Sequence, residues 1–381
     1  MNERVRSWLK PLVWPVVLAG FFAAIYAGRI HKEMVDFEVY RTAAGRAVHA
    51  ENLYRPEDGH YQYKYLPAFA FPMVPFARLD APVARVAWYA LSCGLLVALV
   101  RWSVRALPER NLRGRALVWF AVLFLAKFYA RELNLGQSNI LLGALLVAAL
   151  LAAQVDARRT AGVLVGLGVF VKVYAAILLP WLWLAAGGPG VVAAGLVILA
   201  GLFLPAAVYG WQGNLDQISA WYRTVSETTA PNLLNPENVS AAAMWTKWIG
   251  PGDPAKWLAI GTGTLALLLP ALAMSRRRAV SDPLYLEFGL LMLLVPVLSP
   301  QGWDYVLLLA TPAIICIVDR WRQVTLAWRV VTGAAIFFMS FTIFDVMGRS
   351  LYRFMMDISI MTVAVLTLAV CLVNLRWRAL A

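Results

Sequence analysis

The chain has 381 residues, of which 61% are hydrophobic and 14% are charged, and its formal net charge is +13. Apolar runs recur along its whole length, which excludes a soluble globular protein, because a helical crossing of a bilayer needs about 20 apolar residues. We therefore predict an all-α polytopic membrane protein. The first apolar run is followed by no small-residue cleavage pattern, so we interpret it as a retained helix.

Twelve apolar segments qualify as membrane crossings in chain order. Broken helices and snorkelling side chains allow segments shorter than an ideal crossing to count. The predicted crossings are 11–28, 83–100, 116–131, 138–153, 161–172, 173–186, 190–208, 257–274, 284–298, 303–318, 329–344 and 358–375.

Basic residues predict the orientation. With the N-terminus inside, the cytoplasmic segments hold 18 basic and five acidic residues. The net charge is therefore explained by the positive-inside rule, which places both termini in the cytoplasm, and no nucleic-acid partner is needed. These basic residues are Arg4, Arg6, Lys10, Arg101, Arg105, Arg110, Arg113, Arg115, Arg158, Arg159, Arg276, Arg277, Arg278, Arg320, Arg322, Arg329, Arg376 and Arg378.

Two long stretches face outward by this parity. Residues 29–82 are predicted as the first periplasmic loop, with interfacial helices, and 209–256 as a large periplasmic loop. Segment 65–79 is apolar but interrupted by three prolines, and a full crossing there would turn the arginines of 101–115 outward. We predict a re-entrant or interfacial helix on the outer face. Residues 1–381 are expected to form one integral membrane domain.

Asp36 lies in the segment 35–48, directly after the first crossing. An aspartate that opens a short helix is a good N-cap, and the apolar side of that helix could lie on the bilayer surface. The alternative is a carboxylate that accepts the proton of an attacking sugar hydroxyl. The apolar side comprises Val39, Tyr40, Ala43, Ala44, Ala47 and Val48.

Two basic residues lie at the outer ends of crossings. Lys172 separates two short apolar runs, so we predict an outer turn with this lysine at its tip. It is either a snorkelling side chain or a cation for a phosphate group. Arg131 could pair with Glu132 or anchor a helix end, but it adjoins the polar residues 137–139. Polar groups that converge at one depth predict a site open to the outer leaflet.

The segment 209–256 is rich in tryptophan, which could stack on sugars of an acceptor or form an aromatic belt at the headgroup level. These tryptophans are Trp211, Trp221, Trp245 and Trp248. The three cysteines lie inside apolar runs, and the three histidines lack the spacing of metal ligands. Neither a disulfide framework nor a metal site is predicted.

Six segments, in this order, resemble the bacterial polyprenol-phosphate-mannose-dependent mannosyltransferases, which form glycosyltransferase family 87 of the GT-C class. The segments are DFEVY (36–40), YKYLPAFAFPMVPFARL (63–79), LGQSN (135–139), GLGVFVKVYAAILLPWLW (166–183), NLLNPENVSAAAMWTKWIG (232–250) and LSPQGWDYVLLLA (298–310). The resemblance covers roughly 36–312 and implies a GT-C-type fold with about 12 transmembrane helices and outer-face interfacial or re-entrant helices. Many relatives carry a histidine where this chain has Tyr305.

The resemblance also implies roles. Asp36 matches the catalytic base, Lys172 matches a lysine near the lipid phosphate, and Arg131 is expected to assist it. The expected substrate-binding residues are Tyr40, Arg41, Tyr63, Lys64, Gln137, Asn139, Asn238, Gln301, Trp303 and Asp304.

The predicted function is transfer of a hexose, by resemblance mannose, from a polyprenyl-phosphate donor to a glycolipid or polysaccharide acceptor. The reaction would invert the anomeric centre on the outer face of a bacterial cytoplasmic membrane. A phosphate monoester needs less help in leaving than a nucleotide diphosphate does, so no cofactor or divalent metal is expected. The alternative is a multi-pass transporter, although no matched pair of broken segments indicates inverted repeats.

Overall fold

The computed structural model describes residues 17–32 and 34–378. Three of the predicted cytoplasmic basic residues, Arg4, Arg6 and Lys10, and the start of the segment 11–28 lie outside these ranges. The helices are Val17–Gly28, η1 Ile30–Lys32, α2 Val35–Val48, η2 Pro56–Tyr61, η3 Pro67–Met73, α3 Val74–Ala77, α4 Ala81–Ala106, α5 Gly114–Leu135, α6 Asn139–Gln154, α7 Arg158–Val171, η4 Val173–Leu178, α8 Leu179–Phe203, α9 Ala206–Asn232, α10 Ala241–Ile249, α11 Asp253–Ser275, η5 Arg277–Ala279, α12 Leu284–Leu298, η6 Asp304–Ala310, α13 Thr311–Asp319, η7 Trp321–Gln323, α14 Leu326–Phe341, α15 Phe344–Asp357 and α16 Ile360–Arg378.

The prediction of an all-α chain is confirmed for the described residues, where the only β pairing is an isolated bridge between Asn238 and Trp303. Four helical stretches are long and apolar enough to cross a bilayer, and α14 with α15, bent by 108°, gives a fifth if it counts as one span. The predicted number of twelve crossings is not confirmed. The four stretches are Ala81–Ala106, Val173–Phe203, Asp253–Ala279 and Ile360–Arg378.

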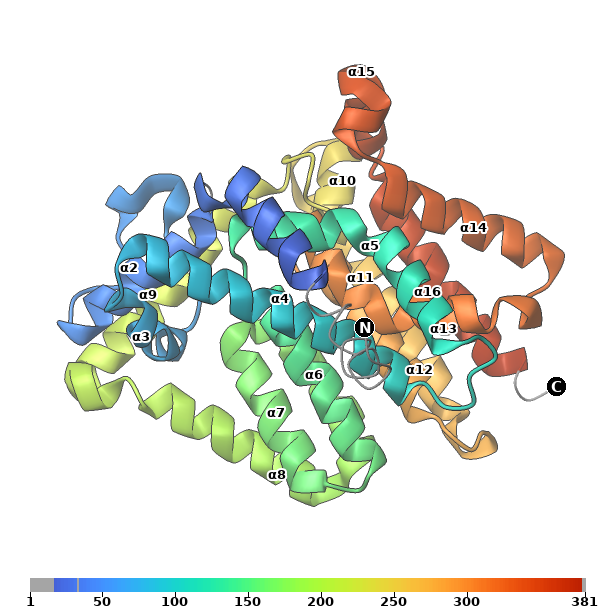
Figure 1. The fold of residues 1–381 in the computed structure, drawn as a ribbon, viewed down its shortest axis with the longest axis horizontal. Helices are drawn as coiled ribbons and strands as arrows, with labels where there is room; N and C mark the ends of the chain where they lie inside the picture. The colour runs from blue at the N-terminus through green and yellow to red at the C-terminus, as the bar shows by residue number, and fades with distance from the viewer. Residues whose placement is uncertain (1–16, 33, 379–381) are drawn as a thin grey trace, which may run out of the picture.

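α7 packs along α8, and α6 lies beside α7 (Figure 1). Gly187, with φ of +64°, breaks the helical path of α8. Beyond that break, a Cβ on Gly162 would lie 2.0 Å from the Gly190 carbonyl oxygen, and one on Gly166 would lie 3.0 Å from the Ala194 carbonyl oxygen. The contact partner on α8 moves from 190 to 194 as the position on α7 moves from 162 to 166, so the second half of α8 runs parallel to α7. The break at Gly187 therefore falls between the predicted segments 173–186 and 190–208.

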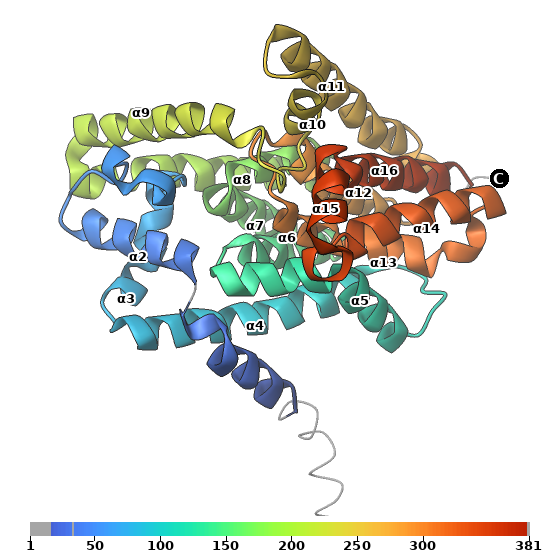
Figure 2. The same cartoon turned by 90° about the horizontal axis from the view of Figure 1, so that it is seen from above.

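The segment 65–79 contains η3, which has 7 residues, and α3, which has 4 residues. With a rise of about 2.0 Å per residue in the 3-10 part and about 1.5 Å in the α part, the two together are about 20 Å long and cannot cross a hydrocarbon core of about 30 Å. With α2 they lie at one end of the molecule, beside the start of α4 (Figure 2). Segment 209–256, predicted as a large loop, consists mainly of helices α9 and α10.

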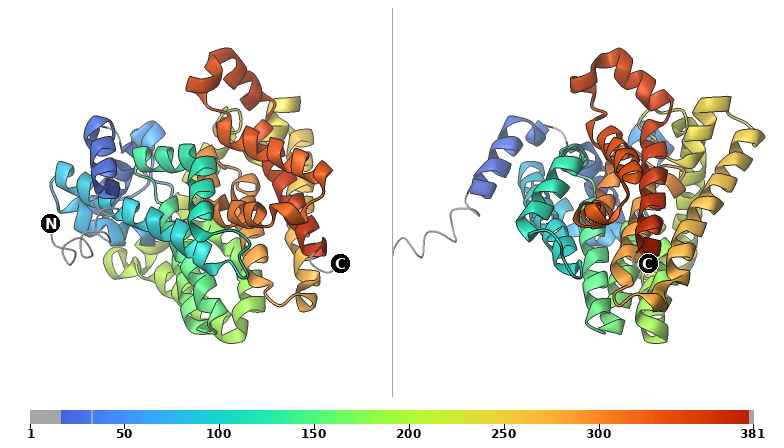
Figure 3. Two further views of the ribbon diagram at one scale, coloured as in Figure 1. Left: turned by 45° about the vertical axis from the view of Figure 1, so that its right-hand side comes forward. Right: turned by 90° about the vertical axis from the view of Figure 1, so that its right-hand side faces the viewer.

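The core is built from the central helices α12 and α13 with η6 between them. Every side chain from 285 to 297 and from 304 to 319 is buried, so these helices are enclosed by protein on all sides. At the periphery, α15 projects at one end, and α16 runs from it to the opposite end of the molecule (Figure 3).

Candidate active site

The site begins where α2 meets the end of α5. Gly136 ends α5 with φ of +68°, and a Cβ there would lie 2.7 Å from the Cβ of Phe37. Glycine therefore permits both the left-handed turn and the close approach of α2. The Met34 amide, which precedes α2, donates to the Asn134 carbonyl oxygen at 2.9 Å. These contacts fix the first turn of α2, which carries Asp36, beside the LGQSN segment.

Asp36 lies inside the first turn of α2, whose N-cap is Met34 in the left-handed conformation. The prediction that Asp36 is the N-cap is therefore wrong, although a helix N-terminus still favours a nearby carboxylate. The apolar side of α2 packs against the protein, so the prediction that it lies on the bilayer is also wrong. The buried residues are Phe37, Tyr40, Ala43, Ala44 and Ala47.

Gln137, which is buried, is the centre of a polar cluster. Its Oε1 accepts hydrogen bonds from the hydroxyls of Tyr40 and Tyr65, each at 2.9 Å. The Lys172 Nζ approaches the same oxygen at 3.5 Å. The side-chain nitrogen donates to the Tyr305 hydroxyl at 3.2 Å. Three distant segments of the chain, together with α2, therefore meet at one amide group.

The electrostatics of Asp36 suit a proton acceptor. Burial raises the pKa of this carboxyl, and a hydrogen bond from Gln137 and the nearby charges of Lys172, Lys64 and His60 partly oppose that shift. The pKa of Lys64 is in turn lowered by burial, which the negative charge of Asp36 opposes. Asp36 is thus a partly desolvated carboxylate with two lysines close to it.

Lys172 lies at a break in the chain, because α7 ends at Val171 and Lys172 is extended, with φ of −153°. The predicted break between the two apolar runs is thus present at Lys172, and its position at the outer face stays a prediction. The ammonium lies 4.2 Å from the centroid of the Tyr65 ring. The partly buried side chain turns inward to the polar cluster, which disagrees with the snorkelling alternative.

Arg131 has two carboxylate partners. Its Nη1 donates to Glu237 at 2.8 Å, its Nη2 forms a second, shorter bond to the same carboxylate, and it lies 3.4 Å from Asp304. The alternative pairing of Arg131 with Glu132 is wrong. The guanidinium also lies 5.7 Å from the centroid of the Tyr305 ring, which connects this ion-pair group to Gln137.

Glu132 has a structural role at the start of α6. This fully buried carboxylate accepts hydrogen bonds from the Asn139 side chain at 3.0 Å and from the Ile140 amide at 3.0 Å. The Asn139 amide also donates to it, and the Tyr174 hydroxyl donates to the Asn139 side-chain oxygen. The polar atoms of Asn139 are thus engaged within the protein, and its predicted substrate-binding role stays a prediction.

The two segments around 238 and 303 are joined by the isolated bridge of Asn238 with Trp303. The Asn238 amide nitrogen donates to the Pro300 carbonyl oxygen at 2.9 Å, and that of Gln301 donates to the Thr229 hydroxyl at 2.9 Å. Asn238 and Gln301 therefore hold the segments together. Their substrate contacts stay predictions.

Two further predicted residues, Arg41 and Tyr63, bond to backbone carbonyl oxygens near the Gln137 cluster and not to Gln137 itself. Arg41 donates to the carbonyl oxygens of Phe76 and Leu79 at 3.1 and 2.9 Å, which fastens α2 to α3. Tyr63 is fully buried, and its hydroxyl donates to the Leu66 carbonyl oxygen at 3.2 Å. Both side chains support the fold around the site.

Three residues of the site were not predicted from the sequence, namely Tyr65, Tyr305 and Glu237. Tyr65 and Tyr305 both hydrogen-bond to Gln137, and Glu237 pairs with Arg131. Two of the three occur as an aromatic residue beside a predicted polar one, in YKY and WDY. That adjacency is the one signal that could have indicated them.

Comparison with known proteins decides the family. The sequence profile described as Glycosyltransferase family 87 matches residues 63–300, which is more than half of the chain. The chain belongs to this family. Glycosyltransferase family 87 members are enzymes, so this membership decides against the transporter alternative.

A protein of similar sequence is the polyprenol-phosphate-mannose-dependent alpha-(1-2)-phosphatidylinositol mannoside mannosyltransferase of Mycobacterium tuberculosis. It is 26% identical over 377 residues, which cover 90% of this chain and 84% of that protein. No solved structure matches this family 87 glycosyltransferase. The region that matches the family profile, 63–300, includes Gln137, Lys172 and Glu237 and ends just before Gln301, whereas Asp36 precedes it.

Proposed function

We propose that this family 87 enzyme transfers mannose from a polyprenyl-phosphate donor to a glycolipid acceptor, with Asp36 as the general base. The proposal is supported by the family, by the specificity that the mycobacterial relative is named for and by one structural observation. That observation is the partly desolvated Asp36 carboxylate, held beside Gln137 with Lys64 and Lys172 close to it.

The proposed reaction is a single displacement with inversion at the anomeric carbon. The Asp36 carboxylate accepts the proton of an acceptor hydroxyl, whose oxygen forms the new bond to the anomeric carbon. The bond from that carbon to the phosphate oxygen breaks, and the polyprenyl phosphate leaves with the electron pair. A raised pKa makes Asp36 a stronger base than an ordinary aspartate, which suits proton removal from an alcohol.

We assign stabilisation of the departing phosphate chiefly to Lys172, with Lys64 beside it. Both ammonium groups lie near Asp36, so a donor bound there would meet the base and the cations together. Arg131 was expected to share this role. Its charge is already balanced by Glu237 and Asp304, so we assign it the positioning of Tyr305 and the outer segments.

We place this site on the outer face of the cytoplasmic membrane, with both termini inside. The placement rests on the basic residues at the other ends of the helices, such as Arg277 and Arg320. A lipid-linked donor is suited to that face because it needs no nucleotide sugar. The exposed Trp211 and Trp248 of the segment 209–256 are available to an acceptor glycan or to the headgroup layer.

The test is reconstitution of the full chain in vesicles with polyprenyl phosphates carrying mannose, glucose or a pentose. Glycolipid and polysaccharide acceptors are supplied in parallel. We expect transfer of mannose to the glycolipid. Loss of a general base should lower the rate by about 100-fold or more in Asp36→Ala and Asp36→Asn.

The matched control is Asp216→Asn, because Asp216 is an exposed aspartate on α9 that bonds to Gln212. It should transfer like the wild type. Full activity of Asp36→Ala would overturn the assignment of the base, whereas transfer from a different donor would correct the sugar and leave the base in place.

A further inference from the structure

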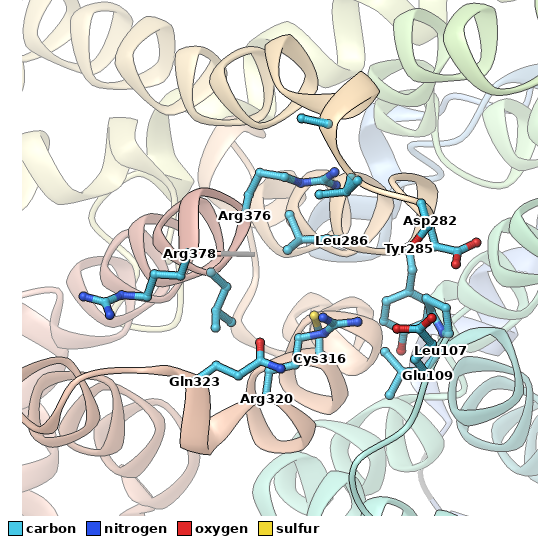
Figure 4. A pocket seen from close by; sticks show the side chains of 15 residues that line it. Leu107, Glu109, Asp282, Tyr285, Leu286, Cys316, Arg320, Gln323, Arg376 and Arg378 are labelled. Atoms are coloured by element: carbon cyan, nitrogen blue, oxygen red, sulfur yellow. The ribbon is translucent and has the colours of Figure 1, made fainter. Parts of the chain in front are cut away.

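A cavity of about 660 Å³ is lined by residues at the ends of α4, α12, α13 and α16 (Figure 4). Trp88 of α4 stacks on Phe37, next to Asp36, whereas Leu107, which follows the end of α4, lines the cavity. At 1.5 Å per residue these two positions on α4 are about 28 Å apart. A second cavity of about 500 Å³ adjoins it and shares Asp282 and Tyr285. Both cavities are therefore separate from the proposed active site.

The guanidinium of Arg376 is buried at this cavity without enough partners. Its side chain is 2% exposed, and its Nη2 donates to the Pro283 carbonyl oxygen at 2.7 Å. Its Nε and Nη1 have no hydrogen-bond partner among the described residues, and the nearest carboxylate oxygen, of Glu287, is 3.7 Å away. Arg277 is 3.8 Å from the same carboxylate. Buried charged donors that stay unpaired are costly, so such donors indicate a missing partner.

A second arginine meets the same cavity. Arg320, at the end of α13, lines it and also has a buried Nε without a partner in the described chain. Gln323 adds a donor at its edge, whereas the exposed guanidinium of Arg378 points away from the cavity (Figure 4). Guanidinium groups bind phosphate oxygens through parallel hydrogen bonds, which makes phosphate the anion that best fits this group of donors.

The cavity wall is partly apolar. Leu286, Cys316 and Leu375 line it together with the arginines, and the carboxylates Glu109 and Asp282 lie at its exposed rim. An anion attached to a hydrocarbon would contact both kinds of surface. The positive-inside rule places this end of the helices at the cytoplasmic leaflet.

We propose that this cavity is a binding site for a phosphate group at the cytoplasmic face, with Arg376 and Arg320 as its donors. An inner-leaflet phospholipid and soluble phosphate carry the same chemistry. The mixed lining favours the phospholipid. The site is distinct from donor and acceptor binding, so it does not depend on the proposed mannosyl transfer.

The experiment measures thermal unfolding of the full-length protein in detergent with three probes. Phosphatidic acid and diacylglycerol with the same chains differ only in the phosphate, and inorganic phosphate tests the soluble source. We expect phosphatidic acid to raise Tm and diacylglycerol to leave it unchanged. A Tm rise with inorganic phosphate at equal concentration would support the site and assign it to soluble phosphate.

The variants separate binding from folding. Arg320→Gln should bind phosphatidic acid about tenfold more weakly, because it loses a charged donor. The double variant Arg376→Gln/Glu287→Gln removes both buried charges together and should lose the response entirely. Arg278→Gln removes an exposed arginine of the same face that does not line the cavity, and should respond like the wild type.

Two outcomes would overturn the proposal. The first is an equal response of the wild type to phosphatidic acid and diacylglycerol, or no response to any of the three probes. The second is an Arg320→Gln variant that responds like Arg278→Gln. If the double variant fails to fold, Arg320→Gln decides alone, because Arg320 forms no ion pair in the described residues.

Discussion

The Tyr40 hydroxyl donates to the side-chain oxygen of Gln137 at 2.9 Å. Tyr40 lies one helical turn after Asp36, on the same face of α2. The Gln137 oxygen also accepts from Tyr65. Because the oxygen is occupied, the side-chain nitrogen of Gln137 is the group directed at Tyr305 and at the Asp36 carboxylate. The tyrosines thus set the orientation of Gln137, and Gln137 in turn orients the proposed base.

We predict that Gln137→Glu lowers kcat by about tenfold or more, because the variant loses the donor to Asp36 and adds a second carboxylate. Both changes raise the pKa of Asp36, so the acid side of the pH–rate profile should move to higher pH. Steady-state kinetics over a pH series measures this. The exposed Gln212→Glu is the control. A lower rate with an unmoved profile would mean that Gln137 has only a structural role.

Lys172→Gln should lower kcat/KM for the lipid-phosphate donor by about 100-fold, because a cation that stabilises developing charge is lost. Arg131→Gln should affect Tm more than kcat/KM, since it breaks the pairing with Glu237 and Asp304. The exposed Lys256→Gln is the control for charge on the outer face. If Arg131→Gln cost more in donor kinetics than Lys172→Gln, the two assignments would be reversed.

The pH dependence of transfer is expected to follow from two groups with shifted pKa, Asp36 and Lys64. As pH falls through the raised pKa of Asp36, the base is protonated, so kcat/KM should fall at a higher pH than an aspartate of pKa about 3.9 would give. As pH rises, Lys64 loses its charge earlier than an ordinary lysine because burial lowers its pKa. We expect a bell-shaped profile.

The variant Lys64→Gln tests this assignment. The charge of Lys64 lowers the pKa of Asp36, so its removal should move the acid limb upward and weaken the alkaline limb. The exposed Lys32→Gln should leave both limbs in place. An acid limb unchanged in Lys64→Gln would show that another group controls it.

Local patterns in the sequence predicted the helix at 35–48 but not what covers its apolar side. The segment 35–48 was predicted as a helix and is α2, Val35–Val48. Its periodicity showed an apolar side but could not show whether protein or lipid covers it. That depends on Gly136, which lies 99 positions after Phe37 in the sequence and admits its side chain because glycine has no Cβ.

Long-range pairing was equally beyond local patterns. Arg131 and Glu237 are 106 positions apart, so the adjacent Glu132 was the natural candidate partner for the arginine. Glu132 instead meets backbone donors at the start of α6, which only the packed helices bring to it. Lys172 was identifiable because it interrupts an apolar run, a signal contained within a few residues.

Gly136→Ala should destabilise the protein by about 2 kcal/mol or more, since the left-handed turn is strained with a Cβ and the added atom meets Phe37. Thermal unfolding in detergent measures the loss. Gly45→Ala is the control, because a Cβ at this position of α2 meets nothing within 4 Å and favours the helix. Equal Tm values for the two variants would contradict the packing of α2 on α5.

Removal of divalent metals should leave mannosyl transfer unchanged. A polyprenyl phosphate leaves as a phosphate monoester, and the cations of Lys172 and Lys64 lie beside the proposed base to balance its charge. The wild type is assayed in vesicles with EDTA and then with added Mg²⁺ or Mn²⁺. Lys172→Gln is assayed in the same way, because a metal that replaced the lysine would restore its rate. Loss of wild-type activity in EDTA, recovered by one of these ions, would contradict the assignment of charge stabilisation to the lysines.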